Sequence, residues 1–168
     1  MATTIQTFNS RSGFGIDRTS LISNTLDVKN VNTLELQNSN FIDGSSKKFI
    51  LKGNSTTTLG TDNAGSAIPI SNNTVNFITS HVIGVDSTGA GHYSLKNEVV
   101  IKCGPSGIIE ILSSLDTIIK DSIPTGQTWT VSPSTPQANA FSYFVTRSGT
   151  SAAIKWFAYS EVVKVVWT

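Results

Sequence analysis

Histidine and cysteine are the scarcest reactive side chains of this sequence, which holds two histidines and one cysteine. His81 and His92 both lie in strand-like stretches, and no third ligand follows either at a metal-binding spacing. A structural or surface role is therefore favoured over a metal site built by trimer symmetry. Cys103 lies in the alternating stretch EVVIKCG, which favours a small buried apolar side chain. A lone cysteine also excludes an intramolecular disulfide.

Nucleophilic and acid–base chemistry both lack a recognisable set of residues. Serine is too abundant to be informative, and Gly104–Ile108 (GPSGI) lacks the strand-to-helix setting of a nucleophile elbow. Gly13–Gly15 (GFG) supplies only part of a phosphate fingerprint and has no βαβ unit around it. The eleven acidic residues are scattered, so no carboxylate pair marks a glycosidase cleft. The sequence predicts a protein that is not an enzyme and has no catalytic residues, cofactor or metal.

The composition narrows the class of protein. Charged residues make up 14% of the 168 residues, against roughly 25% in ordinary globular proteins, and Ser, Thr, Asn and Gly supply the polarity. Such uncharged polar sequences are typical of extracellular or virion β-proteins. The net charge of +1, without a basic run, argues against nucleic-acid binding. The sequence predicts no signal peptide and no membrane insertion, so we expect synthesis in a host cytoplasm and release by lysis or within a particle.

The composition changes near residue 72. Residues 1–71 are poor in aromatics, and their short β-prone pieces (TSLISNTLDV, NTLELQ and KKFILKG) alternate with polar turns. Such a stretch has little apolar surface to bury by itself. We therefore expect an extended segment that partner subunits stabilise or that is partly disordered. A small independent domain is the alternative.

Residues 72–168 show the pattern of an all-β domain. Strand-like stretches recur about every dozen residues with Gly-, Pro- and Asn-rich turns between them, which predicts an antiparallel, jelly-roll-like β-sandwich. The stretch IIEILSSLDTIIKD is interpreted as two strands rather than a helix, because its isoleucines are β-branched.

Large aromatic side chains concentrate toward the end of the chain, on strands that are apolar on both faces. The candidate core consists of Trp129, Val131, Ile154, Trp156 and Ala158. The candidate oligomer interface consists of Phe144, Phe157, Tyr159, Val163 and Val165. Monomers generally avoid such an apolar patch, so sister subunits are the favoured cover. The two faces of residues 154–166 are both apolar, and their assignment could be reversed.

Several of these residues also carry a family resemblance. The pattern Gly91-His92-Tyr93, a later Trp129-x-Val131, and a closing strand with Trp156 resembles a β-sandwich domain of virion structural proteins from tailed bacteriophages. The stretch FNSRSGFGIDRTSLISNTLDVKNVNTLEL is similar to the leaders of cyanophage fibre-like proteins. The resemblance implies a virion component, commonly trimeric, that docks on the particle at one end and projects a β-domain.

Together these observations predict a short homotrimeric fibre or spike on the tail, baseplate or neck of a phage particle. Residues 1–71 would bind other virion proteins, and residues 72–168 would project, with a contribution to host adhesion. One alternative is a capsid decoration (cement) protein that clamps coat subunits. Another is a carbohydrate-binding module that contacts a host-surface glycan, because aromatic side chains exposed on a β-sandwich can stack on sugars.

Overall fold

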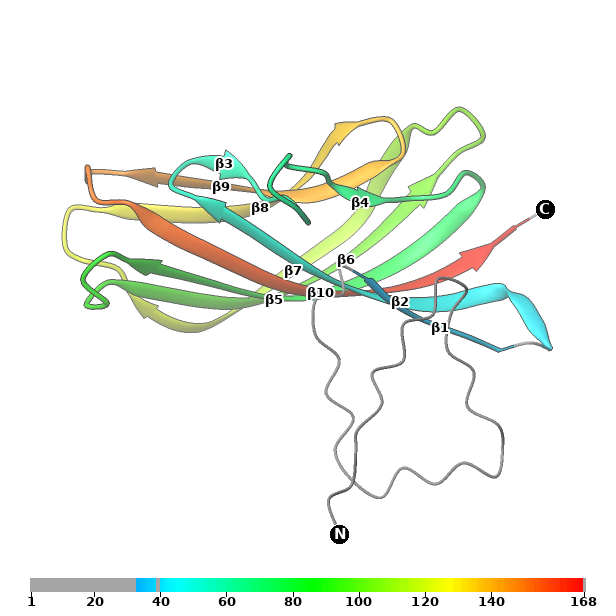
Figure 1. The fold of residues 1–168 in the computed structure, drawn as a ribbon, viewed down its shortest axis with the longest axis horizontal. Helices are drawn as coiled ribbons and strands as arrows, with labels where there is room; N and C mark the ends of the chain where they lie inside the picture. The colour runs from blue at the N-terminus through cyan, green and yellow to red at the C-terminus, as the bar shows by residue number, and fades with distance from the viewer. Residues whose placement is uncertain (1–32, 39, 168) are drawn as a thin grey trace, which may run out of the picture. The chain divides into compact units, whose positions relative to one another are not determined.

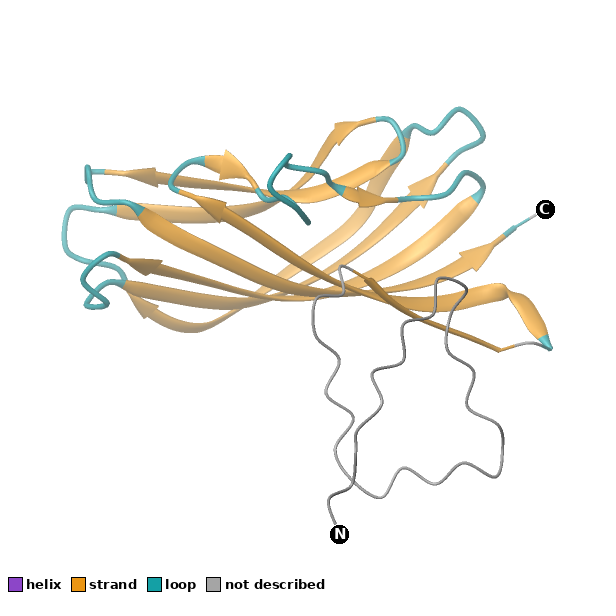
Figure 2. Cartoon of the chain, in the orientation of Figure 1, coloured by secondary structure: helices purple, strands orange, loops and turns teal. Residues whose placement is uncertain are grey.

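The computed structural model describes residues 33–38 and 40–167, and these residues form strands joined by turns (Figures 1 and 2). Within the described residues there are ten strands and no helix. The strands are β1 (Thr33–Asn38), β2 (Phe41–Asn54), β3 (Thr57–Thr58), β4 (Ile68–Pro69), β5 (Thr74–Asp86), β6 (His92–Cys103), β7 (Ile109–Ser122), β8 (Thr128–Gln137), β9 (Ala140–Ser148) and β10 (Ile154–Val166). The all-β fold class that the sequence predicts is confirmed.

The larger layer is an antiparallel sheet of six described strands in the order β1-β2-β10-β5-β6-β7. Strand β10 lies at its centre and pairs with β2 on one side and β5 on the other. Along β5, β6 and β10, buried residues alternate with accessible ones, as expected when one face of a sheet packs on a core. The sheet therefore has an inner face and an outer face.

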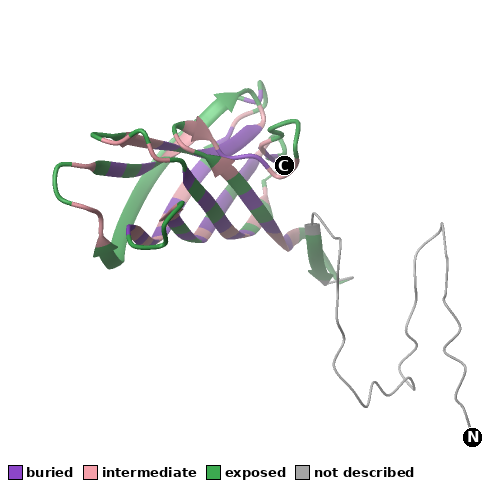
Figure 3. Cartoon of the chain, turned by 60° about the vertical axis from the view of Figure 1, so that its left-hand side comes forward, coloured by how far each residue is buried: buried purple, intermediate pink, exposed green. Residues whose placement is uncertain are grey.

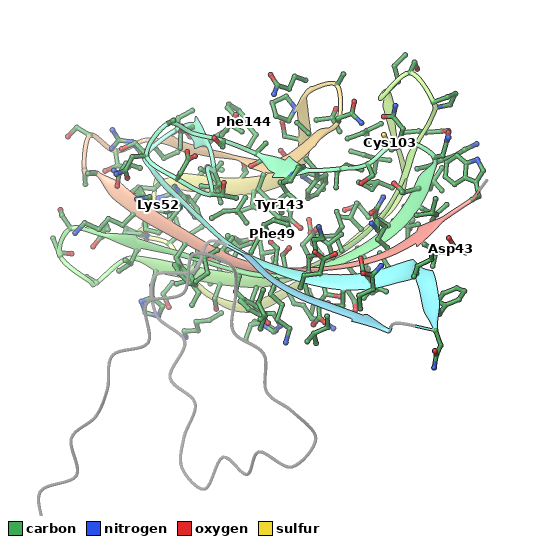
Figure 4. The ribbon with its side chains drawn as sticks, turned by 45° about the vertical axis from the view of Figure 1, so that its right-hand side comes forward. Asp43, Phe49, Lys52, Cys103, Tyr143 and Phe144 are labelled. Carbon is green, nitrogen blue, oxygen red and sulfur yellow. The ribbon has the colours of Figure 1, made fainter. Side chains whose placement is uncertain are left out.

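The smaller layer is built around β9, which pairs with β8 along one edge and with β3 and β4 along the other. Val145 of β9 lies opposite Val131 of β8 and also opposite Thr57 of β3. The side chains between the two layers form one apolar core. Figure 4 shows Phe49 and Tyr143 lying between the layers. The described residues thus form the antiparallel β-sandwich that the sequence predicts.

Trp156 of β10 is the large side chain that joins the two layers. Its ring packs edge-to-face on Trp129 of β8, with 6.0 Å between centroids and 72° between planes. Its indole Nε1 donates a hydrogen bond to the carbonyl of Ser55 at 2.9 Å. Gly53 of β2 and Gly84 of β5 lie directly opposite it on the neighbouring strands. Gly84 leaves space that the ring occupies, whereas Gly53 leaves space for the side chains of Thr57 and Leu59.

A small polar network is enclosed in the apolar core. Tyr143 Oη lies 2.7 Å from Ser80 Oγ and 2.8 Å from Asn97 Oδ1, and Ser80 Oγ lies 2.7 Å from Ser160 Oγ. Asn97 in turn donates from its amide to Asp116. Each polar group of this network has a partner, which is the condition for burying it at low cost.

Two boundaries expected from the sequence are wrong. The domain does not begin near residue 72, because β2 pairs along its length with β10, and Phe49, Leu51 and Leu59 are core residues. Residues 41–70 therefore contribute a strand and core side chains to the sandwich of their own chain. The stretch expected as two strands is the single strand β7. Residues 1–32, which include TSLISNTLDV and slightly less than half of the expected anchoring segment, lie outside the described residues.

Candidate interaction surface

The candidate core residues lie between the two sheets. Trp129, Val131, Ile154, Trp156 and Ala158 are all buried. Along β10 the exposed fractions alternate: Phe157 is 45% exposed, whereas its neighbours Trp156 and Ala158 are 2% and 0% exposed. The alternation therefore assigns the two faces of β10 as expected and removes the possibility that they are reversed.

Four of the five candidate interface residues share the outer face of the six-stranded sheet. Phe157, Val163 and Val165 are exposed, and Tyr159 is half-buried. They follow one another at two-residue spacing or its multiples along β10, so they point to the same side. The structure therefore brings these four side chains together on one surface.

The outer face extends well beyond β10. Phe157 lies opposite Ile83 of β5, and Val163 lies opposite Phe77. On β1, β2, β5 and β10, the large apolar and aromatic side chains of the outer face are Leu34, Leu36, Ile50, Val75, Phe77, Ile83, Phe157, Tyr159, Val163 and Val165. The contributions of β1, β2 and β5 were missed from the sequence. Their signal was the same alternation, since Val75, Phe77 and Ile83 are outward positions of a strand that the sequence does predict.

A polar belt crosses this face between two apolar groups. Glu161 lies opposite Thr79 on one side and Lys48 on the other. Ser46 Oγ donates to the Glu161 carboxylate at 2.8 Å. A hydrogen bond with Tyr159, followed by the charges of Tyr159 and Glu161, raises the pKa of the Lys48 ammonium. The belt offers directional polar contacts in the middle of an otherwise apolar face.

Phe144 does not belong to this surface, and the structure does not bring it together with the other four candidate interface residues. It lies on β9 in the smaller sheet, where it points away from the core while Tyr143 points into it (Figure 4). Its cross-strand neighbours are Ser132 and Thr58, which are polar. A single exposed aromatic among polar residues is ordinary protein surface.

The residues considered for chemistry do not converge. His81 is exposed on the outer face beside Tyr159, and His92 lies at the start of β6. No group of three or more His, Cys, Asp or Glu side chains is placed to hold a metal ion within residues 33–38 and 40–167. Cys103 is buried in the core, and this burial raises the pKa of its thiol. A buried thiol of this kind is poorly placed to act as a nucleophile.

A hollow of about 450 Å³ lies beside the turn that follows β2. Its polar lining includes Lys52, Asn54, Asp62, Asn63 and Lys155. Several of these groups already bind one another: Lys52 Nζ donates to Asn63 Oδ1, and the Asp62 carboxylate accepts the backbone N–H of Ser66. Trp156 also borders the hollow, but at 2% exposure its ring offers no stacking face for a sugar.

Within the described residues, no helix is long and apolar enough to span a bilayer.

Comparisons with known proteins give a structural likeness but no match by sequence. No protein-family model matches the chain, and no curated protein sequence does. A crystal structure of the tailspike protein gp49 from Acinetobacter baumannii bacteriophage Fri1, a capsular polysaccharide depolymerase, is similar over 81% of this chain with a TM-score of 0.44 and 12% identity. The matched region is 21% of the tailspike chain, so this chain spans about a fifth of that protein. At this TM-score the likeness carries no argument about function.

Proposed function

We propose that this chain is a structural protein of a tailed-phage particle, not an enzyme, and that it assembles as a homotrimeric short fibre or spike. The observation that carries the proposal is the apolar outer face of the six-stranded sheet. Its ten large side chains expose on the order of 800 Å², which matches what one partner contributes to a standard protein interface.

In this proposal the outer faces of three sandwiches meet around a common axis. Phe157, Phe77 and Val163 would lose contact with water, and Glu161 and Lys48 of the polar belt would fix the relative orientation. The number three and the phage context come from the sequence resemblance to trimeric virion fibres. The segment that precedes the sandwich, residues 1–32, would dock on other virion proteins of the tail, baseplate or neck, and the sandwich would contribute to host adhesion.

The mass of the full chain in solution tests the assembly. Size-exclusion chromatography with light scattering should give a multiple of three times 17.9 kDa. Phe157→Lys should abolish that factor of three, because a buried unpaired charge at an interface is costly. Phe144→Lys is the matched control: the same residue type, with a similar exposed fraction of 39%, lies on the other sheet and should leave the mass unchanged.

A monomeric wild type would overturn the trimer. Equal effects of the two substitutions would show that the outer face is not the interface. The particle location needs a separate measurement, mass spectrometry of purified heads and tails. Presence in tails alone supports a fibre or spike, whereas presence in heads alone would favour a capsid decoration protein.

A further inference from the structure

Strand β7 is exposed on both faces and along one edge. It ends the six-stranded sheet, so only β6 hydrogen-bonds to it within the described part of the chain. Nearly all its residues are exposed, and Figure 3 draws the strand green over almost its whole length. Its exposed large apolar side chains are Ile111, Leu112, Leu115, Ile118 and Ile119. Long apolar edge strands recruit other strands, because their outward N–H and C=O groups are unpaired.

From the sequence and register of this edge we infer that β7 pairs antiparallel with β7 of a second copy, with Leu115 on the two-fold axis. The stretch EILSSLDTIIK, residues 110–120, is complementary to itself in this register. Glu110 meets Lys120 of the other copy, and the residues between them pair as Ile111 with Ile119, Leu112 with Ile118, Ser113 with Thr117, and Ser114 with Asp116. Every apolar side chain meets an apolar one, and each charge at the ends meets its opposite.

The proposed pairs also lie on matching faces of the sheet. The register with β6 places Ser113, Leu115 and Thr117 on the outer face, opposite Val100, Glu98 and Lys96. It places Ser114 and Asp116 on the inner face, opposite Val99 and Asn97. Directly opposed residues of an antiparallel pair share a face. The two-fold register pairs outer with outer and inner with inner.

The irregularities of β7 fit the same register. The register with β6 shifts between Val100 and Ile101 and between Ser94 and Leu95, which leaves Leu112 and Ile119 as the extra residues of β7. Bulges often protect an edge from pairing. Here they lie three residues before and four residues after Leu115, so Leu112 of one copy meets Ile118 of the other, and Ile119 meets Ile111. Between them, residues 113–117 form a regular ladder.

The lengths of the other free edges favour a second β7 as the partner. Among the described strands, β7 has 14 residues, whereas the opposite edge strand β1 has 6 and the short strands β3 and β4 have 2 each. Strand β8 has 10, but Pro133 and Pro136 lack the N–H donors that a ladder needs. Only another β7 matches β7 in length and charge. Glu110 and Lys120 make no ion pair with any described residue, so both are available.

This edge contact is independent of the proposed trimer, because it uses β7 rather than β10 and β5. A trimer through the outer face combined with pairs through β7 would give six copies with D3 symmetry. A failure of one contact is distinguishable from a failure of the other. Glu110→Lys should leave three copies, and Phe157→Lys should leave two.

Charge exchange across the two ends tests the register. Glu110→Lys and Lys120→Glu each place like charges opposite one another twice per dimer, and each should raise the dimer Kd roughly ten-fold or more. The double variant Glu110→Lys/Lys120→Glu restores opposite charges and should recover the wild-type Kd. Sedimentation equilibrium at low salt measures all four proteins. A double variant no better than the single variants would overturn the proposed pairing, as would a wild type with no two-fold association.

Cysteine cross-linking gives a second readout that does not depend on affinity. Leu115→Cys places two thiols opposite each other on the axis, at a Cβ separation of about 4.5–5.5 Å, close to disulfide distance. Thr117→Cys, on the same face and also exposed, places them about 14 Å apart. The wild type, whose single cysteine is buried, is the background control. Mild oxidation should cross-link the Leu115→Cys variant alone. Cross-linking of neither variant, or of both at equal rates, would overturn the register.

Discussion

The sandwich depends on the space that Gly84 leaves for the ring of Trp156, and filling that space is a sharp test of the packing. A Cβ atom added to Gly84 would lie 2.4 Å from Trp156 Cζ3 and 2.7 Å from Cε3. The ring cannot move away freely, because it packs on Trp129 and its Nε1 is hydrogen-bonded to Ser55. Gly84→Ala should therefore strain the contact between the two layers.

The expected cost follows from two opposing effects. Overpacking a core costs about 1–3 kcal/mol, and the loss of a glycine from the unfolded chain returns about 0.4–1 kcal/mol. The net loss should be about 1–2 kcal/mol in the free energy of unfolding. For a chain of this size that corresponds to a fall in Tm of roughly 2–8 °C. Urea unfolding and calorimetry measure the two quantities.

Two further variants separate the clash from a general intolerance of alanine. Gly104→Ala is the matched control, because its nearest neighbouring atom would be 4.0 Å from the added Cβ, and it should be close to neutral. In a Trp156→Phe background, Gly84→Ala should cost less, because the atoms that meet the new Cβ are gone. A Gly84→Ala protein as stable as the wild type, or an equal cost in both backgrounds, would refute the packing argument.

Hydrogen bonds of the core and of the turn after β5 give three more testable outcomes. Tyr143→Phe should cost about 1–3 kcal/mol in urea unfolding, because Ser80 and Asn97 lose a buried partner. Burial raises the pKa of Tyr143. The stability linked to its hydroxyl should therefore be complete below about pH 10 and fall as the pH rises further. Tyr143→Phe should remove that part of the alkaline loss in a curve of Tm against pH. A hydrogen bond from the Thr88 hydroxyl lowers the pKa of Asp86. The contribution of this carboxylate to stability should therefore be present near neutral pH and lost as the pH falls through its folded-state pKa. Asp86→Asn should flatten the acid side of the same curve.

Each of these outcomes can fail separately. A Tyr143→Phe protein with wild-type stability would show that the buried network contributes no net free energy. An unchanged alkaline limb would assign the loss to another group. If Asp86→Asn leaves the acid side of the Tm-against-pH curve unchanged, the acid loss of stability belongs to a group other than Asp86.

The sequence predicts each strand face better than it predicts the arrangement of strands. Alternation alone assigns Trp156 to the core and Phe157 to the outer face. It does not show which sheet a strand joins, and so it groups Phe144 with Phe157 although they lie on different sheets. Pairing between strands is long-range information that one strand's pattern does not carry.

The two errors of boundary have local physical causes. Leu112 and Ile119 interrupt the alternation of β7 because they are bulge residues, and the break looks like a second strand. Phe49 and Leu51 belong to the short apolar run FIL, and Leu59 follows a run of threonines, so a largely polar stretch gives little signal of a core. Phe49 and Leu51 become core residues because β2 pairs with β10, which lies about a hundred residues further along the chain. Leu59 lies beside β9, where its N–H donates to the carbonyl of Tyr143 at 2.8 Å. Because the pairing of β2 with β10 is so distant in the sequence, the sequence also does not show that the outer face extends onto β2.

The central claim is that sister copies cover the apolar outer face of the six-stranded sheet. The most direct measurement is the mass of the full chain by light scattering, at high micromolar concentration, beside Phe157→Lys and Phe144→Lys. The account predicts a multiple of three times 17.9 kDa for the wild type and Phe144→Lys, and the loss of that factor in Phe157→Lys. A monodisperse wild-type monomer of 17.9 kDa would contradict it.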